Sequence, residues 1–179
     1  MIQTKSSRCA WVTGDPFYMD YHDHEWGRPV FEERHLFEML ILEGAQAGLS
    51  WITILRRRES YREAFLDFDP ALLSKMGPED VERLMQNSGI IRHRRKIVSA
   101  INNAKAWQAL KVTGSPVDFL WECVGGEPRL NDFKDAGEVP SETKESRALS
   151  QALKKAGFSF VGPTICYAFM QAVGMVNDH

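Results

Sequence analysis

The chain lacks the features that define several large classes of protein. Its three cysteines, Cys9, Cys123 and Cys166, are an odd number without close spacing, which argues against a disulfide framework. No apolar run is long enough to span a bilayer, and the N-terminal residues lack the apolar segment of a signal peptide. We therefore expect a cytoplasmic protein with no membrane partner.

Motifs for nucleophilic or nucleotide chemistry are also missing. The chain has no Gly-x-Ser-x-Gly elbow, no Walker loop and no dinucleotide-binding fingerprint. Cys123 and Cys166 lie in apolar segments and are better explained as buried thiols than as nucleophiles. The sequence gives no support to covalent catalysis.

Strand-like alternation of apolar and polar residues is nearly absent, as are repeats and low-complexity tracts. Length and composition fit one globular domain over residues 1–179. Apolar spacing and capping signals predict helices throughout, so we expect an all-α fold. The predicted helices cover, approximately, a short segment within 18–26 and residues 33–47, 51–65, 70–75, 78–87, 92–110, 117–123, 143–156 and 164–173, with Ser50, Asp69 and Ser141 as caps.

Charge is unevenly distributed along the chain. The net charge of −2 gives no support to nucleic-acid binding. Between Asn87 and Val117, however, the chain carries basic residues and no acidic ones. The basic residues of this segment are Arg92, Arg94, Arg95, Lys96, Lys105 and Lys111. Such a face can hold a phosphate backbone, and an ordinary solvated helix face explains it equally well.

The segment Leu42–Trp51 has the most unusual composition, because Glu43 and two glycines stand in an apolar helical run. Just upstream, Tyr21–Gly27 adds Tyr21, Trp26 and two histidines. A carboxylate close to aromatic faces suits a flat cationic ring, since aromatic faces attract cations and a carboxylate adds charge and accepts hydrogen bonds. The alternative is a surface glutamate beside core aromatics.

Residues 81–97 are typical of two helices joined by a tight turn. Gly89 would supply backbone freedom for the turn, and Ile90 would fill the space between the helices. The second helix would start near Arg92, so its free amides and positive dipole end would face a docked phosphate. A helical hairpin packed into the core is the other interpretation.

Cys9, His22 and His179 are the only cysteine and histidine positions that we connect as a metal site. Thiolate and imidazole ligands suit tetrahedral zinc, but three ligands fall short of a closed structural site. The residues alone therefore favour no metal. His24, His35 and His93 are expected to be surface or capping residues.

Taken together, these segments resemble the 3-methyladenine DNA glycosylase I family of bacteria along nearly the whole chain. Several long segments match in the same order, which makes the resemblance highly specific. The matching segments are Arg8–Val12, Asp15-Pro16, Tyr21–Asp23, Glu25–Gly27, Leu36–Met39, Leu42–Gly44, Gln46–Trp51, Gly89–His93, Phe160–Gly162, Thr164–Tyr167, Gln171-Ala172 and Val176–His179.

The resemblance implies a helix-hairpin-helix glycosylase fold, with a zinc ion joining the termini. It implies excision of N3-methyladenine from alkylated double-stranded DNA, with free 3-methyladenine as product. Its implied site residues at the base are Glu43, Tyr21 and Trp51 around the flipped base, Trp11 and Trp26 lining the pocket, and Leu49 beside the gap in the DNA. From the hairpin pattern we expect the DNA backbone to be bound by Gly89, Ile90, Arg92, Arg94 and Arg95.

The resemblance also implies that Cys9, His22 and His179 are three of four zinc ligands. The family's fourth ligand is a cysteine a few residues beyond the position of His179, where the sequence ends, so we expect a C-terminal tail to be missing from it. Related enzymes that act on less activated bases use an aspartate after the hairpin. The stretch Arg92–Val117 has no acidic residue, and a selective enzyme for labile cationic lesions fits that absence.

Three other functions remain open at this level. A DNA-binding protein could capture damaged bases without cleaving them, a soluble purine could be the ligand, or the enzyme could accept a broader range of alkylpurines. The basic hairpin argues against the soluble purine, which needs no phosphate grip. We expect a monomer.

Overall fold

A computed structural model describes residues 8–179. It is mostly helical, which confirms the all-α expectation. Its helices are α1 (Pro16–His24), α2 (Glu33–Gln46), α3 (Trp51–Leu55), α4 (Arg58–Ala64), α5 (Pro70–Leu73), α6 (Pro78–Met85), α7 (Arg94–Thr113), α8 (Pro116–Glu122), α9 (Lys144–Lys155) and α10 (Pro163–Ala172), with a short 3₁₀ turn, η1 (Leu66–Phe68). None of the helices described is long and apolar enough to cross a membrane.

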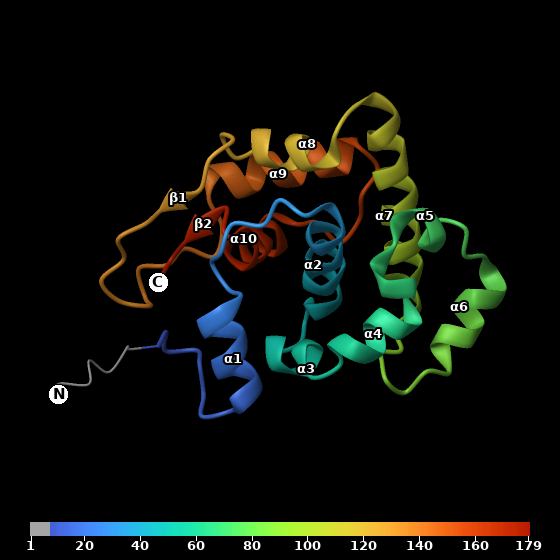
Figure 1. The fold of residues 1–179 in the computed structure, drawn as a ribbon, viewed down its shortest axis with the longest axis horizontal. Coiled ribbons are helices and arrows are strands. Elements are labelled where there is room, and N and C mark those ends of the chain that lie inside the picture. Colours follow the sequence, from blue (N-terminus) through green and yellow to red (C-terminus); the bar gives the residue numbers. More distant parts are fainter. Residues whose placement is uncertain (1–7) are drawn as a thin grey trace.

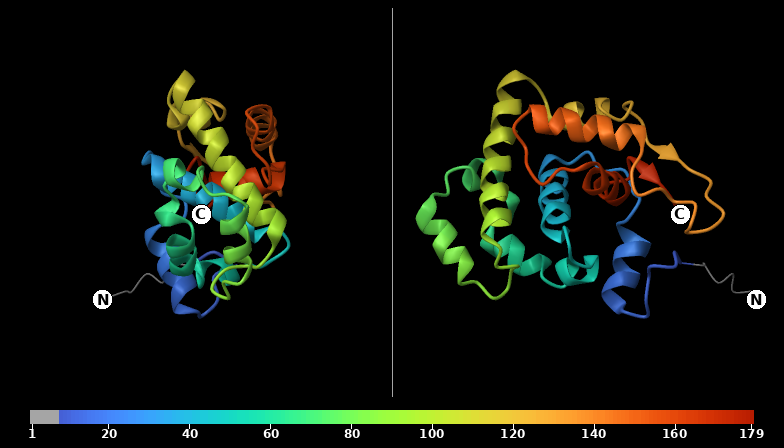
Figure 2. Two further views of the ribbon diagram at one scale, coloured as in Figure 1. Left: turned by 90° about the vertical axis from the view of Figure 1, so that its right-hand side faces the viewer. Right: turned by 180° about the vertical axis from the view of Figure 1, so that it is seen from behind.

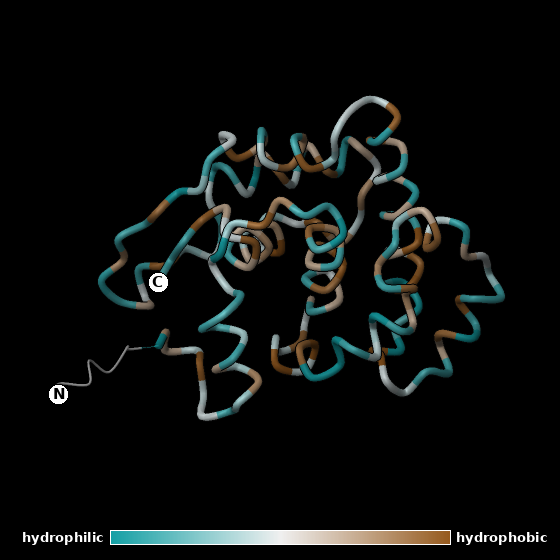
Figure 3. Tube along the Cα trace, in the orientation of Figure 1, coloured by the Kyte–Doolittle hydropathy of each residue, from teal (hydrophilic) through white to brown (hydrophobic). Residues whose placement is uncertain are grey.

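Helix α2 stands at the centre of the molecule (Figure 1). It packs against α10, α7, α3 and α8, while α9 covers α10 from outside. The long helix α7 closes one side, with α5 and α6 beyond it (Figure 2). Hydrophobic residues concentrate on the inner turns of α2 and α10 (Figure 3), where Leu36, Leu42 and Phe169 are fully buried. Because α2 is buried from Leu36 to Ala45, the carboxylate side chains of Glu38 and Glu43 lie inside the protein.

Several helix ends follow the predicted signals. Asp69 caps α5 by accepting hydrogen bonds from the amides of Ala71 and Leu72, and Pro70 occupies the first helical position. Gly157 ends α9 with a φ of +94°. The cap of α9 is Thr143, however, and not Ser141.

The helix predicted over residues 51–65 is wrong, because the chain turns at Arg56 and Arg57 and forms α3 and α4 instead. Arg57 has φ −101° and ψ 1°, outside helical geometry. Ser50 occupies the cap position of α3 without a capping hydrogen bond; its hydroxyl contacts that of Thr53. The turn brings Arg58 to carboxylates on two other elements, a long-range contact that local sequence signals do not report.

The strands are two-residue segments far apart in the sequence. β1 (Arg129–Leu130) pairs in parallel with β2 (Val176–Asn177). Beside them, the buried carboxylate of Asp178 accepts hydrogen bonds from the side chains of Tyr167, Gln171 and Asn131. This bonding holds the C-terminal segment against α10 and against the loop that follows α8.

Candidate functional site

Glu43 lies on the inner side of α2 and is only 4% exposed. Its carboxyl group forms no hydrogen bond or ion pair with any of residues 8–179, and burial raises its pKa to about 8. A carboxyl group in this position is mostly protonated at neutral pH, because the ionised form loses hydration and gains no opposite charge in return. Glu43 therefore becomes negatively charged only when it loses this proton.

Aromatic rings from three segments gather near this acid. The ring centroid of Tyr21, on α1, lies 5.5 Å from that of Trp51 at the start of α3. Trp11 lies 6.4 Å from Tyr21 and 5.2 Å from Trp26. Burial raises the pKa of the Tyr21 hydroxyl, and the nearby Glu43 raises it further. The structure thus brings together the aromatic residues and the carboxylate that the sequence singled out.

Two features of this aromatic cluster were not predicted. The indole Nε1 of Trp51 is buried and has no hydrogen-bond partner among the described residues. Tyr18 packs edge-on against Trp11, with ring centroids 5.3 Å apart, and its hydroxyl accepts a hydrogen bond from the amide of Ile52. Tyr18 stands three positions before Tyr21 on α1, a spacing that could have identified it as a neighbour.

A buried ion-pair network lies beside the aromatic cluster. Arg58, on α4, donates to Glu25 after α1 and to Glu38 on α2, each at 2.7 Å. Arg62 also binds Glu38, and His35 binds Glu25. Burial raises the pKa of Glu25, but the bonds from His35 and Arg58 outweigh it and lower that pKa to about 2. The carboxylates neutralise Arg58, so this cation does not oppose a positive ligand near Tyr21.

Leu49 lies on the turn between α2 and α3 and is 39% exposed. Gly48 before it has a φ of +79°, a conformation that glycine adopts without strain. The amide of Leu49 donates to the carbonyl of Gln46 at 2.7 Å, which holds the turn tight. The result is an apolar side chain presented to solvent next to the aromatic cluster.

The hairpin between α6 and α7 is present, and Ile90 is buried within it as predicted. Helix α7 begins at Arg94, two residues later than predicted, and His93 caps it by accepting from the Lys96 amide. Gly89 has no left-handed φ; it is needed because a Cβ would lie 2.8 Å from Ser60 on α4. The hairpin thus rests directly on α4.

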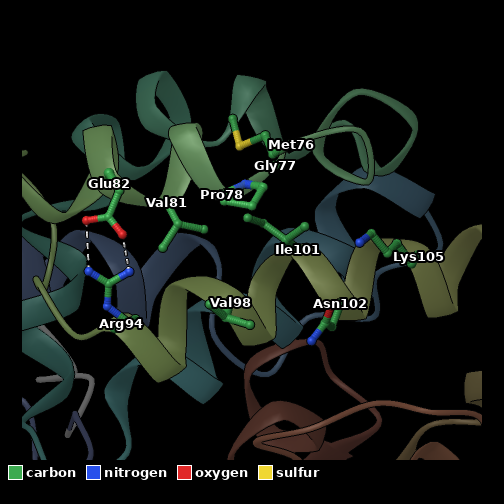
Figure 4. A pocket seen from close by; sticks show the side chains of 10 residues that line it. All are labelled: Met76, Gly77, Pro78, Val81, Glu82, Arg94, Val98, Ile101, Asn102 and Lys105. Carbon is green, nitrogen blue, oxygen red and sulfur yellow. Dashed lines mark hydrogen bonds and ion pairs between the residues drawn. The ribbon is translucent and has the colours of Figure 1, made fainter.

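The three hairpin arginines differ in their surroundings. Arg94 is engaged by both carboxylate oxygens of Glu82. Arg92 and Arg95 are exposed and make no ion pair within the part of the chain described. Arg94 also borders a surface cavity of about 280 Å³ between α6 and α7, with Lys105 near its other end (Figure 4). That cavity lies apart from the residues around Glu43.

The predicted metal ligands lie close to one another at the terminal end of the fold. The rings of His22 and His179 are 4.8 Å apart, and the backbone amide of Cys9 donates to His22 Nε2 at 3.4 Å. Residues 8–179 nevertheless contain no group of three or more His, Cys, Asp or Glu side chains placed to share a metal ion. His24 pairs with Asp20 on the surface, as expected of an ordinary residue.

Comparison with known proteins gives consistent matches. The family model for methyladenine glycosylase matches residues 11–179. DNA-3-methyladenine glycosylase 1 of Escherichia coli (strain K12) is 55% identical over 173 residues, covering 96% of this chain and 92% of its own length. DNA-3-methyladenine glycosylase of Haemophilus influenzae is 53% identical over 175 residues, with 97% and 95% covered.

Solved structures agree with these sequence matches. A crystal structure of 3-methyladenine DNA glycosylase I superposes with a TM-score of 0.95 at 55% identity, covering 97% of this chain and 96% of the other. The 3-methyladenine DNA glycosylase I of Staphylococcus aureus, studied for its recognition of 3-methyladenine, gives 0.93 at 39% identity, with 96% and 92% covered.

Proposed function

The chain belongs to the methyladenine glycosylase family, and on that basis we propose that it removes N3-methyladenine from alkylated DNA and leaves an abasic site. The reaction is hydrolysis of the N-glycosidic bond. The bond between the sugar C1′ and the base nitrogen breaks, and its electron pair leaves with the base. Water adds its oxygen to C1′ and releases a proton.

The observation that carries this proposal is the buried Glu43 among aromatic rings. N3-methyladenine in DNA carries a positive charge, whereas normal adenine does not. A cationic base next to Glu43 would supply the opposite charge that no described residue provides, and would stabilise the ionised carboxylate. Normal adenine offers no such compensation. Selectivity for the methylated base therefore follows from the burial of Glu43 without a cation.

The aromatic residues supply the remaining base contacts. Trp51 would stack on the extruded base and Tyr21 would complete the pocket, with Trp11 and Trp26 lining it. A cation above an aromatic face gains about 0.5–2 kcal/mol, most when water is excluded. These contacts would repay the few kcal/mol that base extrusion costs. Leu49, exposed at the adjacent turn, would fill the space that the base vacates.

Catalysis of the bond cleavage itself needs little from the protein. The methylated base is already cationic and leaves as a neutral molecule, so its glycosidic bond is weak beforehand. The stretch 92–117 offers no carboxylate to stabilise a developing sugar cation. We therefore assign Glu43 to base recognition first and to catalysis second.

The hairpin would hold the DNA backbone. Arg92 and Arg95 are exposed next to the start of α7, where free amides and the helix dipole also favour a phosphate. Gly89 and Ile90 would bring the backbone of the turn to the DNA. Arg94 contributes less in this proposal, because Glu82 already neutralises it.

We propose that zinc joins the terminal segments through Cys9, His22 and His179. His22 Nδ1 faces the Asp23 carboxylate and His179 Nδ1 faces the Asn177 carbonyl oxygen, so each ring places its proton on Nδ1. Each Nε2 is then the acceptor nitrogen, the form in which imidazole binds zinc, and in His22 it accepts from the Cys9 amide, which zinc would displace. When bound, the metal would supply structural cross-linking, and the base-binding residues would act without it.

Incubation of the protein with methylated duplex DNA, followed by chromatography of the released bases, tests the proposed activity. We expect free 3-methyladenine with little 7-methylguanine. Release of both bases at similar rates would indicate a broad alkylpurine enzyme. A folded protein that binds the DNA and releases no base would contradict the enzymatic function and leave a damage-binding protein.

A further inference from the structure

Lys96 makes a contact that neither DNA binding nor base recognition explains. Its ammonium group donates to the backbone carbonyl of Ala45 at 2.8 Å and to that of Ala47 at 2.5 Å. Both carbonyls belong to the C-terminal end of α2, whereas Lys96 belongs to the first turn of α7. One side chain therefore joins two elements that lie about fifty positions apart in sequence.

The physical basis of the contact is the end of a helix. The last carbonyls of a helix have no amide partner within it, and they carry the negative end of the helix dipole. At the end of α2, the Gly44 and Gln46 carbonyls are used by the amides of Ala47 and Leu49. Lys96 donates to the two neighbouring carbonyls, those of Ala45 and Ala47. A positive charge is therefore held where the helix end favours one.

The contact connects the two parts of the site that meet DNA. On one side, Lys96 follows Arg95 by one residue, within the turn of α7 where the hairpin would hold phosphate. On the other side, Ala47 precedes Leu49 by two residues, and Ala45 follows Glu43 by two. Gly48 between Ala47 and Leu49 has left-handed φ and gives the turn little intrinsic preference for one geometry. The turn is held internally by the hydrogen bond from the Leu49 amide to the Gln46 carbonyl, and the Lys96 contact with Ala47 adds a restraint from another helix.

We propose that Lys96 is a positioning residue, which couples the hairpin to the Leu49 turn so that Leu49 is aimed at the DNA when the hairpin grips the backbone. This inference rests on the proposed function. Lys96 does not act as a phosphate ligand in this role, because its ammonium group is already committed to the two carbonyls. Its contribution should appear in duplex DNA, where a base must be extruded, and not in binding of the free base.

Single-turnover excision from methylated duplex DNA at saturating protein tests the role of Lys96. We expect Lys96→Met to slow release of 3-methyladenine about tenfold, as the loss of a charge-assisted contact of roughly 1.4 kcal/mol would do. Binding of free 3-methyladenine, followed by tryptophan fluorescence, should change by less than about twofold. Lys96→Arg should restore much of the rate, because a guanidinium can also donate to both carbonyls. Lys155→Met, an exposed lysine on α9, removes the same charge and serves as the control.

A double-mutant cycle with Leu49→Ala identifies the route of the effect. If Lys96 acts through Leu49, Lys96→Met should slow excision much less in the Leu49→Ala background than alone. Additive effects would overturn the proposal, as would equal losses of free-base binding and excision. The slope of log binding constant against log salt concentration reports the number of phosphate contacts. A slope smaller by about one for Lys96→Met would also overturn the proposal, because it would assign Lys96 to a phosphate. Wild-type protein that releases no base would instead contradict the proposed activity itself.

Discussion

Glu43 is buried and has no opposite charge next to it among residues 8–179, and this combination gives the acid its raised pKa. Glu38, five positions earlier on the same helix, is also buried but is bound by Arg58 and Arg62. The two buried glutamates thus differ in whether a neighbouring cation compensates for their lost hydration. Glu38 is bound by two arginines, whereas no described residue supplies a cation to Glu43.

This difference predicts how stability depends on pH. Folding raises the pKa of Glu43 from 4.5 to about 8, so the folded state binds more protons than the unfolded state between these values. The free energy of unfolding should therefore fall as pH rises from about 4.5 to 8, by at most about 1.4 kcal/mol per pH unit from this residue. Glu43→Gln should remove that decline, which urea unfolding at several pH values would measure.

The control for this prediction is Glu63→Gln, which alters an exposed glutamate on α4. It should leave the pH dependence of stability as it is in the wild type. Equal slopes for wild type and Glu43→Gln would show that Glu43 is ionised in the folded protein. The same Glu43→Gln variant should discriminate less well between methylated and unmethylated duplex DNA, because the amide offers no charge to a cationic base; slow excision with normal binding of methylated DNA would instead assign Glu43 to catalysis.

The hairpin shows how one element is positioned by another. Gly89 approaches α4 so closely that a Cβ would meet Ser60 at 2.8 Å. The amide of Ile91 donates to the Tyr61 hydroxyl on the same helix at 3.2 Å. Helix α4 in turn carries Arg58, whose network reaches α1 and α2. The proposed DNA grip and the base-binding residues are therefore joined through α4 as well as through Lys96.

Gly89→Ala should displace the hairpin from α4. Overpacking of this kind lowers the free energy of unfolding by about 1–3 kcal/mol, and a displaced hairpin should also weaken DNA binding. The midpoint of denaturant unfolding and a DNA titration measure the two effects. Gly14→Ala is the matched control, because Gly14 has open space around its Cα and should tolerate the methyl group. An unchanged midpoint for Gly89→Ala would mean that the contact with Ser60 is unimportant.

At the scale of the whole molecule, the C-terminal residue lies against α1 and the turn that follows it. The His179 ring packs edge-on against His22 and Trp26. Gly27 leaves room for this ring, because a Cβ at that position would lie 2.8 Å from it. Trp26 also contacts Trp11 in the aromatic cluster. A cross-link between the termini would therefore hold the base-binding residues of α1 against the rest of the protein.

If zinc provides that cross-link, removing it should lower the thermal stability of the whole protein. We expect protein purified without chelator to contain zinc by elemental analysis. Chelation should lower Tm by roughly 2–8 °C, as a loss of about 1–2 kcal/mol does in a chain of this size. Cys9→Ser should lose the metal and respond no further to chelator, whereas Cys123→Ser should keep it. Metal-free protein with an unchanged Tm would remove zinc from the proposal.

Much of this protein could be predicted from local patterns in its sequence. Asp69 and Pro70 mark a helix start, and Gly157 marks a helix end, because caps and breakers act within one turn of the chain. Glu43 and the aromatic residues could be selected because a carboxylate in an apolar helical run is chemically unusual. Their roles at the base remain a prediction, as do those of the hairpin arginines and the zinc ligands.

Other features depend on contacts between distant segments, and no local pattern could predict them. The break between α3 and α4 contains no glycine or proline and places Arg58 next to Glu25 and Glu38. Gly89 is required by Ser60, and Lys96 binds carbonyls on α2. Helix propensity and capping are properties of neighbouring residues, whereas burial, ion pairing and the pKa of Glu43 exist only after the whole chain has packed.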